Sequence, residues 1–232
     1  MTEQGPLPAT ARLVAVMDRL RSPGGCPWDA DQTHTSLARY LLEETYEVLE
    51  ALDTGDRTLL REELGDLLLQ VVFHARIAAE DTGTAFDFDD VAGDVADKLV
   101  RRHPHVFAGE ATPATDLHAS WERRKRAEKG RHGVLDGIPP AIPALLLATK
   151  YLDRIAAAGL PAPVGPTAGP DTDPEVGPEV GPDADAAAAI GAELLAVVAR
   201  ARGLGVDPEQ ALRTVLAEIR AAVSGDAGPA VE

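Results

Sequence analysis

The stretch "LLEETYEVLEALDTGDRTLLREELGDLLLQ", residues 41–70, decides the expected fold because it sets acidic side chains among leucines and valines at helical spacing. Residues three or four apart share one face of a helix. Glu44 and Glu47 therefore share a face, as do Glu63 and Asp66, and both faces border apolar positions. Gly55 predicts a short turn between the two helices, so they should run antiparallel with their carboxylates facing one another.

Four carboxylates held close together repel one another, and each raises the pKa of its neighbours. A bound cation removes this conflict, and ligands that are all oxygen favour Mg²⁺, or Mn²⁺, over zinc. The pattern predicts a metal-dependent enzyme that acts on a phosphorylated substrate. The alternative is a pair of solvated helix faces, which is the usual meaning of a single E-x-x-E motif. Two such motifs that flank one turn and border apolar stripes favour the metal site.

Basic residues gather in two later segments, "DKLVRRHPHVF" and "SWERRKRAEK". Lys98 and Arg102 are four residues apart, with Arg101 beside them, and Trp121 and Lys125 have the same spacing. Paired cations hold phosphate oxygens, and a tryptophan stacks on a base or ribose. The alternatives are a solvated helix end for the cations and a core anchor for the tryptophan.

The composition also favours helices. The chain has 232 residues, of which 45% are apolar and only 4% aromatic, so leucine, valine and alanine must fill the core. Few segments alternate with the period of two that is typical of strands. We predict loops at residues 22–34 and 101–116, and helices at residues 9–21, 36–52, 58–81, 89–102, 117–130, 186–203 and 208–223.

The net charge of −16 argues against general nucleic-acid binding, which requires a positive surface. It leaves room for a small anionic substrate held by a local basic cluster. Cys26 is the only cysteine, which rules out an intrachain disulfide and favours a reducing compartment. No apolar stretch has the length of a signal peptide or a membrane span. We therefore expect a cytoplasmic protein without membrane contact.

Residues 161–184 are rich in proline and glycine and predict a disordered linker. An internal repeat lies on its two sides, because "LGDLLLQVVFHAR" (64–76) aligns without a gap with "IGAELLAVVARAR" (190–202). The acids change in the second copy: Ala189 corresponds to Glu63, and Ala192 to Asp66.

Taken in order, the segments "GCPWD", "LEETYEVLEAL", "LREELGDLLLQVVFHA", "DKLVRRHPHVF" and "WERRKRAEK" closely resemble the MazG family of nucleoside triphosphate pyrophosphohydrolases over about residues 11–160. The resemblance implies an all-α four-helix arrangement that usually dimerises. It also implies Mg²⁺-dependent hydrolysis of NTPs and dNTPs to the monophosphate and pyrophosphate, with a house-cleaning role against noncanonical nucleotides. Residue by residue, it implies metal ligands at Glu44, Glu47, Glu63 and Asp66, nucleotide contacts at Lys98, Arg101, Arg102, Trp121 and Lys125, and assistance in proton removal by Glu43 or by water.

Some members of this family carry two tandem domains, and here the second one is reduced. The segment "GVDPEQALRTVLAEIRAAV" resembles a closing helix, but Glu218 and Ala222 stand where Lys and Arg are expected. We therefore predict a catalytic domain at residues 1–160, the linker at 161–184, and a degenerate second helical unit at 185–232. Two alternatives are a nucleotide-sensing or partner-binding helical protein, and a hydrolase of another pyrophosphate-containing substrate.

Overall fold

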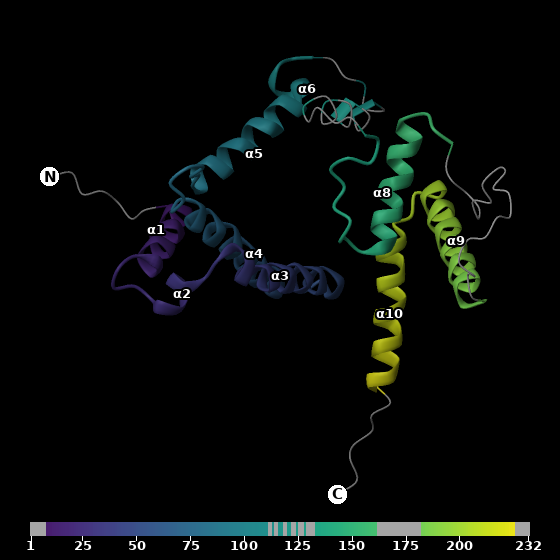
Figure 1. Ribbon diagram of the computed structural model, residues 1–232, viewed down its shortest axis with the longest axis horizontal. Helices are drawn as coiled ribbons and strands as arrows, with labels where there is room; N and C mark the ends of the chain where they lie inside the picture. Colours follow the sequence, from purple (N-terminus) through teal and green to yellow (C-terminus); the bar gives the residue numbers. More distant parts are fainter. Residues whose placement is uncertain are drawn as a thin grey trace, which may run out of the picture. The chain divides into compact units, whose positions relative to one another are not determined.

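The computed structural model describes residues 8–110, 133–161 and 182–225, together with positions 113, 116, 117, 120, 121, 124 and 128. Within these residues every regular element is a helix (Figure 1), which confirms the all-α class. The chain forms two compact units, residues 1–125 and 126–232. None of the described helices is both long enough and apolar enough to cross a membrane.

The first unit begins with the helix predicted at residues 9–21, and the long helix pair follows close to its predicted bounds. Two short helices, α2 and α6, lie inside the segments predicted as loops, and each has a proline at its first position. The helices of this unit are α1 (Ala9–Arg21), α2 (Pro27–Asp31), α3 (His34–Thr54), α4 (Arg57–Ala78), α5 (Phe88–Arg102) and α6 (Pro104–Phe107). The helix predicted at residues 117–130 falls mostly outside the described residues.

Helices α3 and α4 form the predicted hairpin, and they make the most extensive helix contact of the first unit. Gly55 ends α3 with a φ of 69°, a left-handed conformation that glycine adopts without strain. The Asp56 side chain then accepts hydrogen bonds from the backbone N–H groups of Thr58 and Leu59 and so caps α4. At the other end, Thr33 and Ser36 form a reciprocal capping box that starts α3.

The core of the first unit lies where α1, α3 and α4 meet. Met17, Leu37, Val72 and Phe73 are buried together there. An ion-pair network closes one end of this core: the Arg21 guanidinium donates two hydrogen bonds to the Glu80 carboxylate, at 3.0 and 2.9 Å. Arg21 also donates to the backbone oxygens of Asp29 and Gln32, so one buried side chain fixes the loop that carries α2 to α1 and α4.

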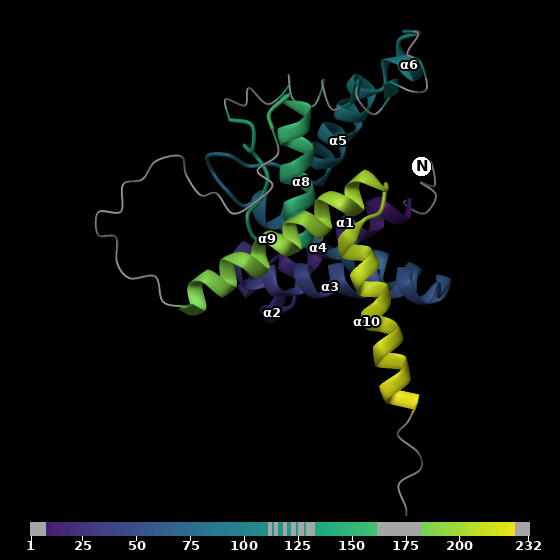
Figure 2. The ribbon, with the colours of Figure 1, turned by 90° about the vertical axis from the view of Figure 1, so that its right-hand side faces the viewer.

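The second unit consists of α8 (Ala144–Ala157), α9 (Pro182–Gly203) and α10 (Pro208–Gly225), which pack against one another (Figure 2). Helices α9 and α10 match the two helices predicted there. Helix α8 groups with them, although the predicted catalytic domain extends to residue 160. The division between the compact units thus differs from the predicted end of that domain. The predicted linker falls largely outside the described residues.

The two units share an ion pair as well as the repeated sequence. In the first unit, Asp18 of α1 binds Arg76 of α4 at 2.8 Å. In the second, Asp153 of α8 binds Arg202 of α9 at 2.5 Å, and Arg202 aligns with Arg76 in the internal repeat. Helix α8 thus takes the place of α1, and α9 takes the place of α4.

The buried positions agree with this equivalence. Met17, which precedes Asp18, and Leu152, which precedes Asp153, are both buried, and so are the aligned Val72 and Val198. The described part of the second unit contains no helix in the place of α3.

Candidate active site

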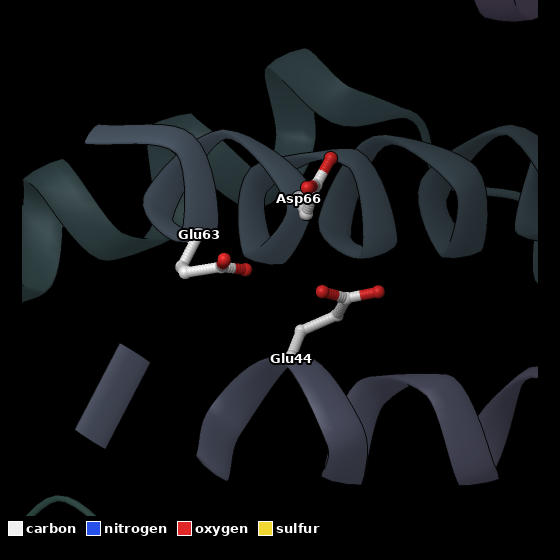
Figure 3. Close-up of side chains that lie close together, drawn as sticks. All are labelled: Glu44, Glu63 and Asp66. Carbon is white, nitrogen blue, oxygen red and sulfur yellow. The ribbon is translucent and has the colours of Figure 1, made fainter. Parts of the chain in front are cut away.

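The hairpin brings three of the predicted carboxylates together. Glu44 extends from α3, and Glu63 and Asp66 extend from α4 into the space between the helices (Figure 3). One carboxylate oxygen from each residue lies within 4.8 Å of the other two. All three side chains are half-buried. The predicted juxtaposition of the two acidic helix faces is therefore present.

The acids change one another's affinity for protons. The pKa of Glu44 is raised from 4.5 to about 7, first by burial, then by a hydrogen bond with the Glu47 side chain, and then by the charges of Asp66, Glu47 and Glu63. A hydrogen bond between two carboxyl groups requires that one of them carry a proton. Near neutral pH, and without a cation, the cluster therefore holds a proton that an ordinary surface glutamate would release.

The pKa of Glu63 is also raised. Partial burial and the charges of Glu47, Asp66 and Glu62, in that order, raise its pKa, and a hydrogen bond with Glu47 adds to the effect. Glu47 itself is exposed and lies outside the group of three, but it is hydrogen-bonded to two of its members. Glu62 was not among the predicted residues, although the doublet "EE" at 62–63 was a signal for it.

The cluster fits a hard divalent cation. Its donors are all carboxylate oxygens, which Mg²⁺ and Mn²⁺ prefer. The pKa values of Glu44 and Glu63 are raised by burial and by the charges of their acidic neighbours, and a bound cation would offset both effects. Glu44, Glu63 and Asp66 are positioned to hold such an ion, with Glu47 beside them. This is the one group of this kind among the described residues, and α9 carries Ala189 and Ala192 at the positions of Glu63 and Asp66.

Glu43 is exposed on α3 and is not part of the cluster. Among the predicted nucleotide-binding residues, Arg101 is exposed and Lys98 is half-buried on α5. Arg102 is only 7% exposed, so it is not a solvated helix end. Its guanidinium carbon lies 5.3 Å from the centre of the Trp121 ring, within the range of a cation–π contact. The structure thus brings two of the predicted nucleotide-binding residues together.

Lys125, the last of the predicted nucleotide-binding residues, lies outside the described residues.

Comparison of this sequence with known proteins identifies the family to which the chain belongs. A family model described as the MazG nucleotide pyrophosphohydrolase domain matches residues 32–107, a range that contains the whole acidic hairpin. A protein of Thermotoga maritima named "Nucleoside triphosphate pyrophosphohydrolase/pyrophosphatase MazG" is 40% identical over 205 residues, which cover 87% of this chain and 78% of that one. The chain belongs to the MazG family.

Other relatives show how far the likeness to this MazG chain extends. The "Nucleoside triphosphate pyrophosphohydrolase" of Escherichia coli K12 is 50% identical over 153 residues, 64% of this chain. The match covers 57% of that relative, so this MazG chain spans little more than half of its length. An uncharacterized 26.1 kDa protein of Streptomyces cacaoi is 45% identical over 93% of this chain and 81% of its own.

The raised pKa of Glu44 gives this MazG site a measurable pH dependence. Because the folded pKa, about 7, lies above the ordinary value of 4.5, the folded chain binds this proton more tightly than the unfolded chain does. The stability that results is present below about pH 4.5 and is lost as the pH rises through 7. Glu44→Gln keeps the uncharged shape, so without metal it should raise the thermal midpoint above wild type at pH 8 and leave it nearly unchanged below about pH 4.

Differential scanning calorimetry in EDTA measures both midpoints, and a repeat with MgCl₂ serves as the comparison. The cation should raise the wild-type midpoint at pH 8 more than that of Glu44→Gln. If the variant unfolds at a lower temperature than wild type at pH 8 in EDTA, burial of the charged carboxylate and repulsion by its acidic neighbours are not what raises this pKa.

Proposed function

We propose that this protein is a Mg²⁺-dependent nucleoside triphosphate pyrophosphohydrolase that converts NTPs and dNTPs to monophosphates and pyrophosphate. The observation that carries the proposal is the convergence of Glu44, Glu63 and Asp66 between two packed helices. Membership of the MazG family and the names of the relatives support the same reaction. The breadth of substrates expected of such a site suits the removal of noncanonical nucleotides in the cytoplasm.

The residues divide the work as follows. Glu44, Glu63 and Asp66 bind the cation, and Glu47, which lies beside Glu44 and Glu63, is the proposed fourth ligand. When bound, the cation supplies a Lewis acid for the phosphate oxygens and lowers the pKa of nearby water. A water oxygen attacks the α-phosphorus while the bond to the oxygen that bridges to the β-phosphorus breaks.

Other residues are proposed to accept the proton of the attacking water and to neutralise the charge of the leaving pyrophosphate. Glu43, next to Glu44 in the chain, is the proposed proton acceptor, either directly or through water. Lys98, Arg102 and Lys125 are the proposed partners for the negative charge that moves onto the leaving group. Trp121, whose ring contacts Arg102, is placed to position a nucleotide held by that cation, with Arg101 at its side.

The protein is proposed to act as a homodimer, because apolar side chains remain exposed along α3 and α4, among them Leu42, Leu64 and Leu68. A second candidate function is a nucleotide sensor that binds NTP without turnover. Ala189 and Ala192 support this second candidate, because they replace the acids Glu63 and Asp66 in the repeated segment of α9.

Phosphorus-31 NMR of the purified chain with MgCl₂ and a panel of NTPs and dNTPs tests the proposal. We expect monophosphate and pyrophosphate to appear together. Diphosphate and orthophosphate would place the attack at the γ-phosphorus and refute the proposed reaction. If no product appears while nucleotide still binds, the sensor function is favoured instead.

A further inference from the structure

Two side-chain contacts hold the segment at residues 117–128, here called the basic segment, to the elements that precede it. The first is the cation–π contact already described, in which the Arg102 guanidinium carbon lies 5.3 Å from the centre of the Trp121 ring. In the second, Nη2 of Arg124 donates a hydrogen bond of 2.8 Å to the Oε2 atom of Glu110. The basic segment is thus tied at two points to the stretch of chain that runs from the end of α5 to residue 110.

The two contacts lie on one face of the basic segment. Trp121 and Arg124 are both helical and three residues apart, so their side chains share a face. Three residues advance a helix by about 4.5 Å, so the contacts are made at two heights along the axis. A single contact would let the helix slide or turn, and a shift of one residue turns a face by about 100°. Two contacts at different heights oppose both movements.

Glu110 extends from a backbone that is itself held in place. The backbone N–H of Glu110 donates a hydrogen bond of 3.2 Å to the backbone oxygen of Pro104, the first residue of α6. The N–H of Ala108 donates to the same oxygen at 2.8 Å. Arg102, two residues before Pro104, is only 7% exposed at the end of α5. The acceptor for Arg124 is therefore anchored close in the chain to the cation that contacts Trp121.

The guanidinium of Arg124 is arranged to hold a position. Its Nη2 atom is bound to Glu110, and its Nε atom is buried with no hydrogen-bond partner among the described residues. These two nitrogens lie along the edge of a guanidinium that pairs with carboxylates. If Glu110 were lost, a partly buried cation would lose its counter-charge, which is unfavourable. The side chain would then turn toward water and release this end of the basic segment.

We propose that Glu110 and Arg124 are positioning residues, which hold the basic segment in the register that sets Trp121 against Arg102. The consequence for binding rests on the function proposed above, in which Trp121 positions the nucleotide. Because the pair acts through Trp121, its loss should raise KM for the nucleotide and change kcat little. Both side chains of the pair are partly exposed, so the pair adds little to the stability of the fold.

Tryptophan fluorescence tests the position of the ring without any nucleotide. In a Trp28→Phe background Trp121 is the only tryptophan. There, Glu110→Arg should increase acrylamide quenching of Trp121 about twofold, because like charges at positions 110 and 124 repel each other. Adding Arg124→Glu exchanges the charges and should return the quenching to its starting value. Glu209→Arg reverses one charge of an ion pair of 3.0 Å in α10 and, as the matched control, should leave the quenching unchanged.

Unchanged quenching in Glu110→Arg overturns the proposal, because the pair then does not position the ring. Quenching that stays high when Arg124→Glu is added also overturns it, because the loss is then not the loss of the pair. Recovery in the double variant supports the proposal and separates a broken pair from a damaged helix.

Binding of an α,β-methylene triphosphate analogue, which has carbon in place of the bridging oxygen, measures the consequence. Isothermal titration calorimetry with MgCl₂ should show a Kd raised about fivefold in Glu110→Arg, the limit that an exposed ion pair sets, and restored in the double variant. A double variant with normal quenching but weak binding would mean that Arg124 touches the nucleotide itself, which overturns a purely positioning role.

Steady-state release of pyrophosphate separates positioning from chemistry. Glu110→Arg should raise KM about fivefold and leave kcat within about twofold of wild type. A kcat that falls by more than KM rises would place the pair in the chemical step and overturn the proposal. If the wild-type chain neither binds the analogue nor releases pyrophosphate, while the quenching of Trp121 changes and recovers as expected, the proposed function fails and the positioning of the ring is still supported.

Discussion

Glu63→Gln is expected to lower kcat/KM for pyrophosphate release by at least about 100-fold, because it removes one of the three oxygens that converge between α3 and α4. Glutamine has nearly the same shape, but its amide is a weak ligand for Mg²⁺ and carries no charge. The variant should still fold. Burial, together with repulsion from Glu47 and Asp66, raises the pKa of Glu63 itself. Loss of the charge relieves both effects, so the metal-free variant should be no less stable than wild type.

The measurement is steady-state release of pyrophosphate from dNTPs at several Mg²⁺ concentrations. Glu218→Gln, which changes an exposed acid on α10, is the matched control and should hydrolyse at the wild-type rate. Glu43→Gln is the informative comparison: a large loss there would support its proposed role with the proton. Hydrolysis by Glu63→Gln at more than about a tenth of the wild-type rate would place the reaction elsewhere in the chain.

Gly25→Ala is expected to destabilise the first unit by about 3 kcal/mol. A Cβ atom at this position would lie 2.2 Å from the backbone oxygen of Leu20 and 2.4 Å from that of Arg19. Backbone at the end of α1 cannot yield as a side-chain tip does. The close approach exists because the backbone N–H of Cys26 donates a hydrogen bond of 2.8 Å to Leu20, so the substitution should break this bond and detach the loop that leads to α2.

Urea unfolding measures the difference, and Gly93→Ala is the control. Gly93 lies within α5, and a Cβ there would meet no atom within 4 Å. Because alanine is a better helix former, this control should stabilise the protein by about 0.5–1 kcal/mol. If the two variants unfold at the same urea concentration, the contact at Gly25 does not restrict the native loop.

The sequence predicted the hairpin and its acids because the signals for them are local. Helical spacing places Glu63 and Asp66 on one face, and Gly55 marks the turn, so neither inference required knowledge of distant contacts. The helix α2 was missed because five residues are too few to display a helical period. Its position depends on Arg21, whose hydrogen bonds to Asp29 and Gln32 reach across the loop.

The burial of Arg102 was missed for a similar reason. Its spacing from Lys98 indicated a cationic face, but only the fold shows its guanidinium above the Trp121 ring. Contacts between residues far apart in the sequence, such as that between His34 and His74, leave no periodic trace in either segment. The apolar side chains of α9 and their alignment with α4 were visible in the sequence, but their exposure required the structure.

The confinement of the acidic site to one helical hairpin has a consequence for folding kinetics. Glu44 and Asp66 are brought together by closing the short loop at Gly55, and closing a short loop costs little chain entropy. Contacts of low sequence separation form early in folding. We therefore expect the three carboxylates to meet before α1 and α5 dock. The repulsion between them then slows the first productive step, and Mg²⁺ in the refolding buffer accelerates it.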